Sequence, residues 1–170
     1  MKRISLCLAF AMSLLLGCAG PMALTSEPKG VVQGTREAPH KLLPSLPADD
    51  KEEFELAQRG LIASKPGVDI RTREGKPVWD MKRYEFLGLG KPAPDTVNPA
   101  LWRHAQRNAI HGLFQVADRI YQVRGYDLSV ISFVEGKTGY IVIDPLISTE
   151  SARAALDLVY EHLPKKPIVA

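Results

Sequence analysis

The chain has 170 residues, of which 45% are hydrophobic and 24% charged, and its formal net charge is +3. This composition is typical of a folded soluble protein and excludes a chain that is disordered throughout. Two of the 22 basic residues lie in the first 17, which leaves 20 basic against 19 acidic residues in the remainder. Nucleic-acid binding needs clustered positive charge, so we exclude that class of function.

Residues 1–17 have the pattern of an export signal. Lys2 and Arg3 precede an uncharged, mostly apolar run over 4–16, which is too short for a transmembrane helix. Residues 15–18 (LLGC) resemble the bacterial lipobox, so we predict that Cys18 is lipidated, with ordinary signal cleavage as the alternative. Either outcome places the protein outside the bacterial cytoplasm, in the periplasm or on a membrane as a lipoprotein. No cysteine follows Cys18, so the exported part has neither a disulfide nor a thiolate metal site.

The next two segments are expected to be loosely organised. Residues 18–48 contain five prolines, which predicts an extended, poorly packed tether. Residues 49–113 are predicted to form an irregular helical arm. A capping box at Asp50 and Glu53 favours a short helix over 50–59, glycines and prolines interrupt 64–97, and Asn98 before Pro99 predicts a helix over 99–111. Its buried stripe is predicted to consist of Leu101, Trp102, Ala105 and Ala109.

Residues 114–170 have the most regular pattern. Strands are predicted over 119–123, 128–135 and 139–144, joined by short glycine-containing turns into an antiparallel meander. A helix capped at Ser148 or Thr149 follows and ends before Pro164, and another strand begins at 167. Strand, helix and strand in this order form a βαβ crossover, so the fold class is α/β and the third and fourth strands should be parallel.

This last segment is expected to be the first part of a larger fold. A parallel strand with no following loop and a helix buried on one side only do not complete two packed layers. Ligands in open α/β sheets bind beyond the carboxyl ends of the strands, where Asp144 lies. Asp144 is therefore the strongest candidate site residue, with capping of the following turn as the alternative interpretation.

Several segments resemble alkyl sulfatases of the metallo-β-lactamase-fold superfamily. The resemblance runs from about Phe54 to Ala170 and is carried by residues 120–129 (IYQVRGYDLS), 139–146 (GYIVIDPL), 58–64 (QRGLIAS), 78–80 (VWD) and 95–103 (DTVNPALWR). It implies an incomplete metallo-β-lactamase-like αββα fold and, for the full-length protein, zinc-dependent hydrolysis of alkyl sulfate esters. The substrate would be a small alkyl sulfate, and a homodimer is expected for the full-length form.

The resemblance also implies where the metal would be. In this family the strand that begins at 168–170 leads into a His-x-His-x-Asp-His loop that binds two zinc ions, and this chain contains none of those positions. No metal ligand or catalytic residue is therefore assigned in this chain, and the chain alone is expected to be inactive. Asp144 would support the metal loop without being a ligand. Relatives often carry Asn where this chain has Val130, which puts the substrate preference or the activity itself in question.

The histidines are weaker candidates. His104 and His111 are seven residues apart on the predicted helix, whereas helical metal pairs are more typical at a spacing of four. His162 lies in the last turn of its helix, where it complements the helix dipole, and His40 lies in the tether. Asp127, with Arg124 and Tyr126, occupies a loop that could approach the site, although a turn explains Asp127 equally well.

Two further functions stay open at this stage. One is a noncatalytic envelope lipoprotein that serves as an interaction module. The other is a metallo-β-lactamase-fold hydrolase that acts on a different ester.

Overall fold

A computed structural model of the chain describes residues 30–45 and 51–170, and Val31–Ala170 form one compact unit. The predicted export signal and Cys18 lie outside the described residues, as does Asp50 of the predicted capping box. Within the described part, no helix is long and apolar enough to cross a membrane.

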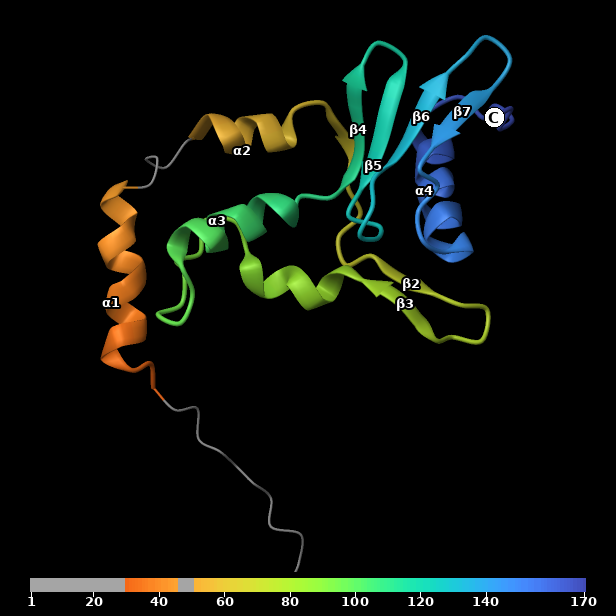
Figure 1. The fold of residues 1–170 in the computed structure, drawn as a ribbon. Helices are drawn as coiled ribbons and strands as arrows, with labels where there is room; N and C mark the ends of the chain where they lie inside the picture. The colour runs from red at the N-terminus through yellow and green to blue at the C-terminus, as the bar shows by residue number, and fades with distance from the viewer. Residues whose placement is uncertain (1–29, 46–50) are drawn as a thin grey trace, which may run out of the picture. The chain divides into compact units, whose positions relative to one another are not determined.

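A five-stranded sheet organises the described residues (Figure 1). Its strand order is β1-β4-β5-β6-β7, and every neighbouring pair in this order is antiparallel. The predicted meander is confirmed as three of these strands, β5, β6 and β7, each within a few residues of its expected bounds. The strands are β1 (Leu61–Ala63), β4 (Gly112–Ala117), β5 (Ile120–Arg124), β6 (Ile131–Glu135) and β7 (Tyr140–Ile143).

The predicted crossover helix is α4 (Thr149–His162), and the Ser148 hydroxyl caps it by accepting a hydrogen bond from the Ser151 amide at 3.0 Å. After α4 the chain returns beside β7, where Tyr140 and Ile168 form a parallel bridge. The Tyr140 amide donates to Pro167 O at 2.8 Å and the Val169 amide donates to Tyr140 O at 2.9 Å. The predicted parallel pairing is therefore confirmed.

The hydrophobic core lies between the sheet and α4. Strand side chains alternate between two faces, so every second residue of β5, β6 and β7 points toward the helix. Leu158 and Val159 of α4 are fully buried, and the rings of Phe133 and Tyr140 meet edge to face at 6.2 Å. Ser151 and Ala155 of the same helix are buried as well.

The opposite face of the sheet is open at β7. Ile120, Val134 and Ile141 share a row across β5, β6 and β7, and Ile143 stands opposite Ser132 in the next row. Ile141 is 43% exposed and Ile143 57% exposed. Figure 1 shows α4 along only one side of these strands. The described residues thus form a sheet with α4 on one face and with exposed isoleucines at β7 on the other.

The arm is more ordered than the sequence predicted. Besides α2 (Lys51–Gln58), it contains the hairpin of β2 (Asp69–Arg71) and β3 (Pro77–Asp80), followed by the 3₁₀ segment η2 (Met81–Leu87). β1 also comes from the arm and joins the main sheet by pairing with β4. Ile70 of the hairpin is part of the core beneath α4. These strands have three or four residues each, too few for an alternating pattern to be visible.

Helix α3 (Pro99–Asn108) begins as predicted, because the Asn98 side chain accepts a hydrogen bond from the Ala100 amide at 2.9 Å. Its predicted buried stripe is wrong at Leu101, which is 62% exposed. Gln106 is buried instead. Its side-chain amide donates to Leu87 O at 2.8 Å and Gly88 O at 2.6 Å, so a polar residue faces inward to satisfy the carbonyls at the end of η2.

The prediction of extended chain over 18–48 is wrong for its described part. Residues 33–45 form helix α1 (Gln33–Leu42) and the 3₁₀ turn η1 (Leu43–Ser45), and neither has a buried residue. Glu37 stabilises α1 locally, since Gln33 donates to it at 2.6 Å and Lys41 pairs with it at 3.6 Å, each four residues away. Pro39 lies within this helix, so counting prolines misjudged the segment.

Candidate functional site

Strand ends and loops converge at one edge of the sheet. Val123 pairs with Ile131, and Ser132 pairs with Ile143, so β5 ends where β6 begins and β7 ends. The parallel segment at Ile168 runs toward the same edge as β7. We call residues 124–131 and 144–147 the strand-end edge. In open α/β sheets such an edge is where ligands bind.

Asp144 lies on the strand-end edge, as the sequence predicted. It directly follows β7, its side chain is exposed, and its backbone φ is +54°, in the left-handed region. Leu146 also has a positive φ, of +71°. Asp tolerates this conformation better than most residues, whereas Leu does not, so Pro145 lies between two residues with left-handed backbone. Residues with sparsely populated backbone angles such as these are common at functional sites.

Asp127 holds the two halves of the strand-end edge together. The residue is 8% exposed; one carboxylate oxygen accepts from the Ser129 amide at 2.9 Å and the other from the Ile147 amide at 2.7 Å. The first bond is the turn that the sequence offered as one explanation. The second joins the loop after β5 to the loop after β7, and no sequence signal predicted it because it spans 20 residues.

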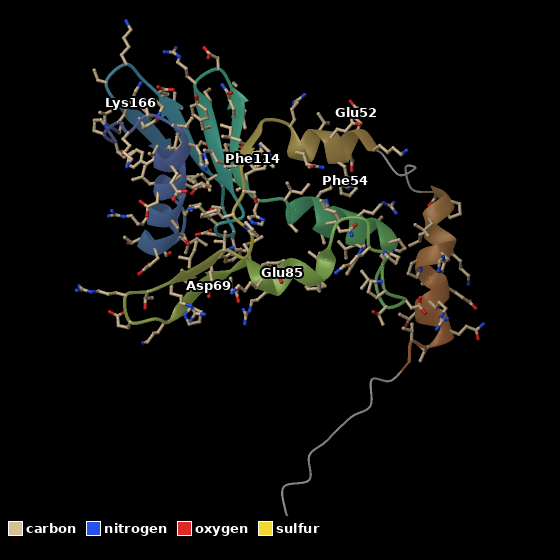
Figure 2. All side chains as sticks on the ribbon, turned by 180° about the vertical axis from the view of Figure 1, so that it is seen from behind. Glu52, Phe54, Asp69, Glu85, Phe114 and Lys166 are labelled. Atoms are coloured by element: carbon tan, nitrogen blue, oxygen red, sulfur yellow. The ribbon has the colours of Figure 1, made fainter. Side chains whose placement is uncertain are left out.

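Arg124 presents a positive charge beside this edge. Its guanidinium donates to the Gln122 carboxamide oxygen at 3.1 Å and lies 4.3 Å from the centroid of the Phe114 ring. Figure 2 marks Phe114 on β4. Among the described residues Arg124 has no carboxylate partner within salt-bridge distance. Burial lowers the pKa of its guanidinium from the usual value, although Arg remains protonated at any physiological pH.

A groove of about 900 Å³ adjoins the strand-end edge. It lies between α2, α3, η2 and the loop over 125–130. Most of its wall is apolar, with contributions from Trp79, Met81, Leu87, Leu128 and Val130. The loop over 125–130 therefore borders both the strand-end edge and this groove.

The charges at the far end of the groove are paired. Arg107 of α3 contacts Glu53 of α2 at 2.6 Å, and its guanidinium lies 5.3 Å from the centroid of the Phe54 ring. Figure 2 labels Phe54 on the side of α2 that faces α3 and Glu52 on the other side. Together these contacts join the two helices that form that end of the groove.

The structure does not bring His104 and His111 together as a metal pair. His104 Nε2 lies 3.1 Å from the Asn108 amide nitrogen, whereas His111 lies beyond the end of α3 with its ring nitrogens 3.0 Å from Ala109 O and 2.9 Å from Lys65 O. His162 is in the last turn of α4, and His40 is in α1. Across residues 30–45 and 51–170, no three His, Cys, Asp or Glu side chains are placed to hold a metal ion.

Comparison with known proteins identifies relatives that match nearly the whole chain. The linear primary-alkylsulfatase of a Pseudomonas species is 47% identical over 168 residues, which is 99% of this chain. The (R)-specific secondary-alkylsulfatase of a Pseudomonas species is 46% identical over 169 residues. This chain is similar to part of these alkylsulfatases. The alkyl/aryl-sulfatase BDS1 of Saccharomyces cerevisiae is a third relative, 47% identical over 134 residues, and no family model matches the chain.

A solved structure agrees with the alkylsulfatase relationship. The stereoselective inverting sec-alkylsulfatase Pisa1 from Pseudomonas superimposes with a TM-score of 0.78 at 50% identity, over 84% of this chain. A double mutant of the same enzyme gives a TM-score of 0.77 over 83% of the chain. The mixed α/β fold predicted from the sequence, part of a metallo-β-lactamase-like fold, is thereby confirmed.

The match covers only a minority of each relative. The chain spans 25% of the length of the two Pseudomonas alkylsulfatases and 22% of the Pisa1 chain. This agrees with the expectation that the chain is part of a larger protein. The described residues do not by themselves fit the pair of zinc ions that the sequence resemblance implies, because no three potential ligands converge.

Proposed function

We propose that this chain belongs to a zinc-dependent enzyme that hydrolyses alkyl sulfate esters, and that the 170-residue chain alone does not catalyse the reaction. The observation that carries the proposal is 47% identity to a linear primary-alkylsulfatase over 99% of the chain but only 25% of that relative. The open face of the sheet supports it, because the exposed Ile141 and Ile143 leave room for further layers of a larger fold.

A chimera tests the proposal. Residues 31–170 of this chain replace the matching residues of the Pseudomonas linear primary-alkylsulfatase, and sulfate release from decyl sulfate is measured with zinc and after chelation. We expect turnover that the chelator abolishes and that added zinc restores. A folded chimera that releases no sulfate, beside an active parent, would contradict the proposal.

Asp144 is proposed to support the metal-binding loop without being a ligand, because it lies at the strand-end edge with a strained backbone. In the chimera we expect Asp144→Asn to lower zinc affinity or turnover by about 10- to 100-fold. Asp118→Asn, at the turn at the opposite end of β5, is the control. Equal zinc content and turnover in both variants would exclude the role.

Export and lipidation are proposed from residues 1–18 alone. Mass spectrometry of the mature protein from a bacterial host is expected to show a lipid on Cys18 as the first residue. An unmodified N-terminus downstream of Cys18 would leave export by ordinary cleavage and exclude the lipid anchor. The homodimer is proposed for the longer protein only, and light scattering of the chimera tests it.

A further inference from the structure

The groove beside the strand-end edge combines an apolar wall with a cation at one end. Arg124 and the loop over 125–130 contribute both to the edge and to the groove wall. The wall beyond them comes from Trp79, Met81 and Leu87. A volume of about 900 Å³ is ample for a linear alkyl chain, since pockets for drug-sized ligands span roughly 300–1,000 Å³.

Among the charged side chains that line the groove, Arg124 is the one that we expect an anion to contact. Glu53 and Arg107 neutralise each other at 2.6 Å. Asp127 also lines the groove, but each of its oxygens already accepts a backbone amide. Arg124 has only a neutral carboxamide and an aromatic ring as partners in the described part of the chain. A guanidinium with spare donors in a half-buried position favours a tetrahedral oxyanion such as a sulfate monoester.

We infer that this groove binds a linear alkyl sulfate, with the alkyl chain against Trp79, Met81 and Leu87 and the sulfate at Arg124 beside the strand-end edge. The choice of ligand rests on the proposed function, while the site rests on the groove and its charges. The arrangement would deliver the ester end of the substrate to the edge where the strands terminate. It assigns substrate binding to residues that hold no metal and take no part in bond cleavage.

Binding is measured by calorimetry on the 170-residue chain, with octyl sulfate kept below its micelle concentration. We expect saturable binding at one site, with 1-octanol weaker and inorganic sulfate weaker still. Arg124→Gln should weaken octyl sulfate binding about tenfold and leave 1-octanol binding unchanged, because it removes the charge and leaves the apolar wall intact. Arg153→Gln, an exposed residue of α4 that does not line the groove, is the matched control.

Tryptophan fluorescence locates the ligand independently. Trp79 lines the groove and Trp102 does not, and these are the two tryptophans of the chain. Octyl sulfate should change the emission of the natural chain, and Trp79→Phe should abolish that change while circular dichroism confirms the fold. Unsaturable binding, or equal weakening by Arg124→Gln and Arg153→Gln, would overturn the inference. The binding experiment measures no turnover, so an inactive chimera would not change its result. Failure to bind octyl sulfate would likewise leave the result of the chimera experiment unchanged.

Discussion

Asp127 and Asp144 both lie at the strand-end edge, but the sequence and the structure emphasise different ones. The sequence favoured Asp144, because a carboxylate after a β-branched strand is a visible pattern. In the structure Asp127 connects the two loops of the strand-end edge, because its carboxylate accepts a hydrogen bond from each of them. The bond to Ile147 depends on how β5, β6 and β7 align, which local residue patterns do not encode. Asp127 could be located on a turn from sequence, but its second partner could not.

Loss of the Asp127 carboxylate should loosen the strand-end edge. Asp127→Ala removes two hydrogen bonds to a buried charged group, so we expect the free energy of unfolding to fall by about 2 kcal/mol. Urea denaturation of the 170-residue chain measures the change. Asp157→Ala, at an exposed position of α4, is the control and should cost much less. Equal stability of the two variants would show that the link between the loops is not energetically significant.

Gly125 is required by a close approach as well as by its backbone angle. Its φ is +77°, and an added Cβ would lie 2.4 Å from His111 Cβ. Gly75 has a similar φ of +82° but open space around it. Gly75→Ala should therefore cost only the left-handed strain, about 1 kcal/mol, whereas Gly125→Ala should cost on the order of 3 kcal/mol because overpacking adds to it. Similar losses in the two variants, measured by urea denaturation, would rule out the steric explanation.

At the scale of elements, regular segments were predictable and short ones were not. The β5 to β7 meander, α3 and α4 carry alternating or helical patterns long enough to detect, together with local caps such as Asn98 and Ser148. By contrast, β1 has three residues and pairs with β4, about 50 positions later. Such a strand exists because a distant partner offers free hydrogen-bonding groups. The sequence of the arm therefore suggested irregular chain where the structure has strands.

The packing of β7 against α4 should give a characteristic alkaline transition. Burial is the main cause that raises the pKa of Tyr140 in β7, and of Tyr126 in the loop after β5, to about 12. Tyr140 also donates its hydroxyl hydrogen to Pro164 O at 2.9 Å, which favours the neutral form. An unfolded tyrosine ionises near pH 10, so the unfolded chain loses protons first. This contribution to stability is complete below pH 10 and disappears as the pH rises to about 12.

Denaturant unfolding at several pH values measures this transition, and tyrosinate absorbance of the folded chain follows ionisation directly. We expect Tyr140→Phe to flatten the loss of stability between pH 10 and 12. Tyr84→Phe, on the partly exposed η2 segment, should leave it unchanged. Ionisation of all tyrosines near pH 10 in the folded chain would contradict the burial argument.

At the scale of the molecule, the described residues have a core beneath α4, and the second face of the sheet is exposed at β7. α4 buries the side chains on one side, and Ile141 and Ile143 of β7 are exposed on the other. The sequence predicted the single crossover helix after the meander, but not which part of the sheet stays exposed. It could not locate the groove, because α2, α3, η2 and the loop over 125–130 come together only in the folded chain.

We propose that these residues are one part of an alkylsulfatase whose catalytic centre they do not complete. The most direct measurement is sulfate release from decyl sulfate by the purified 170-residue chain, saturated with zinc and verified as folded by circular dichroism. We expect no release above the rate of buffer with zinc. Zinc-dependent turnover by this chain would refute the proposal, because the described residues bring no three metal-binding side chains together.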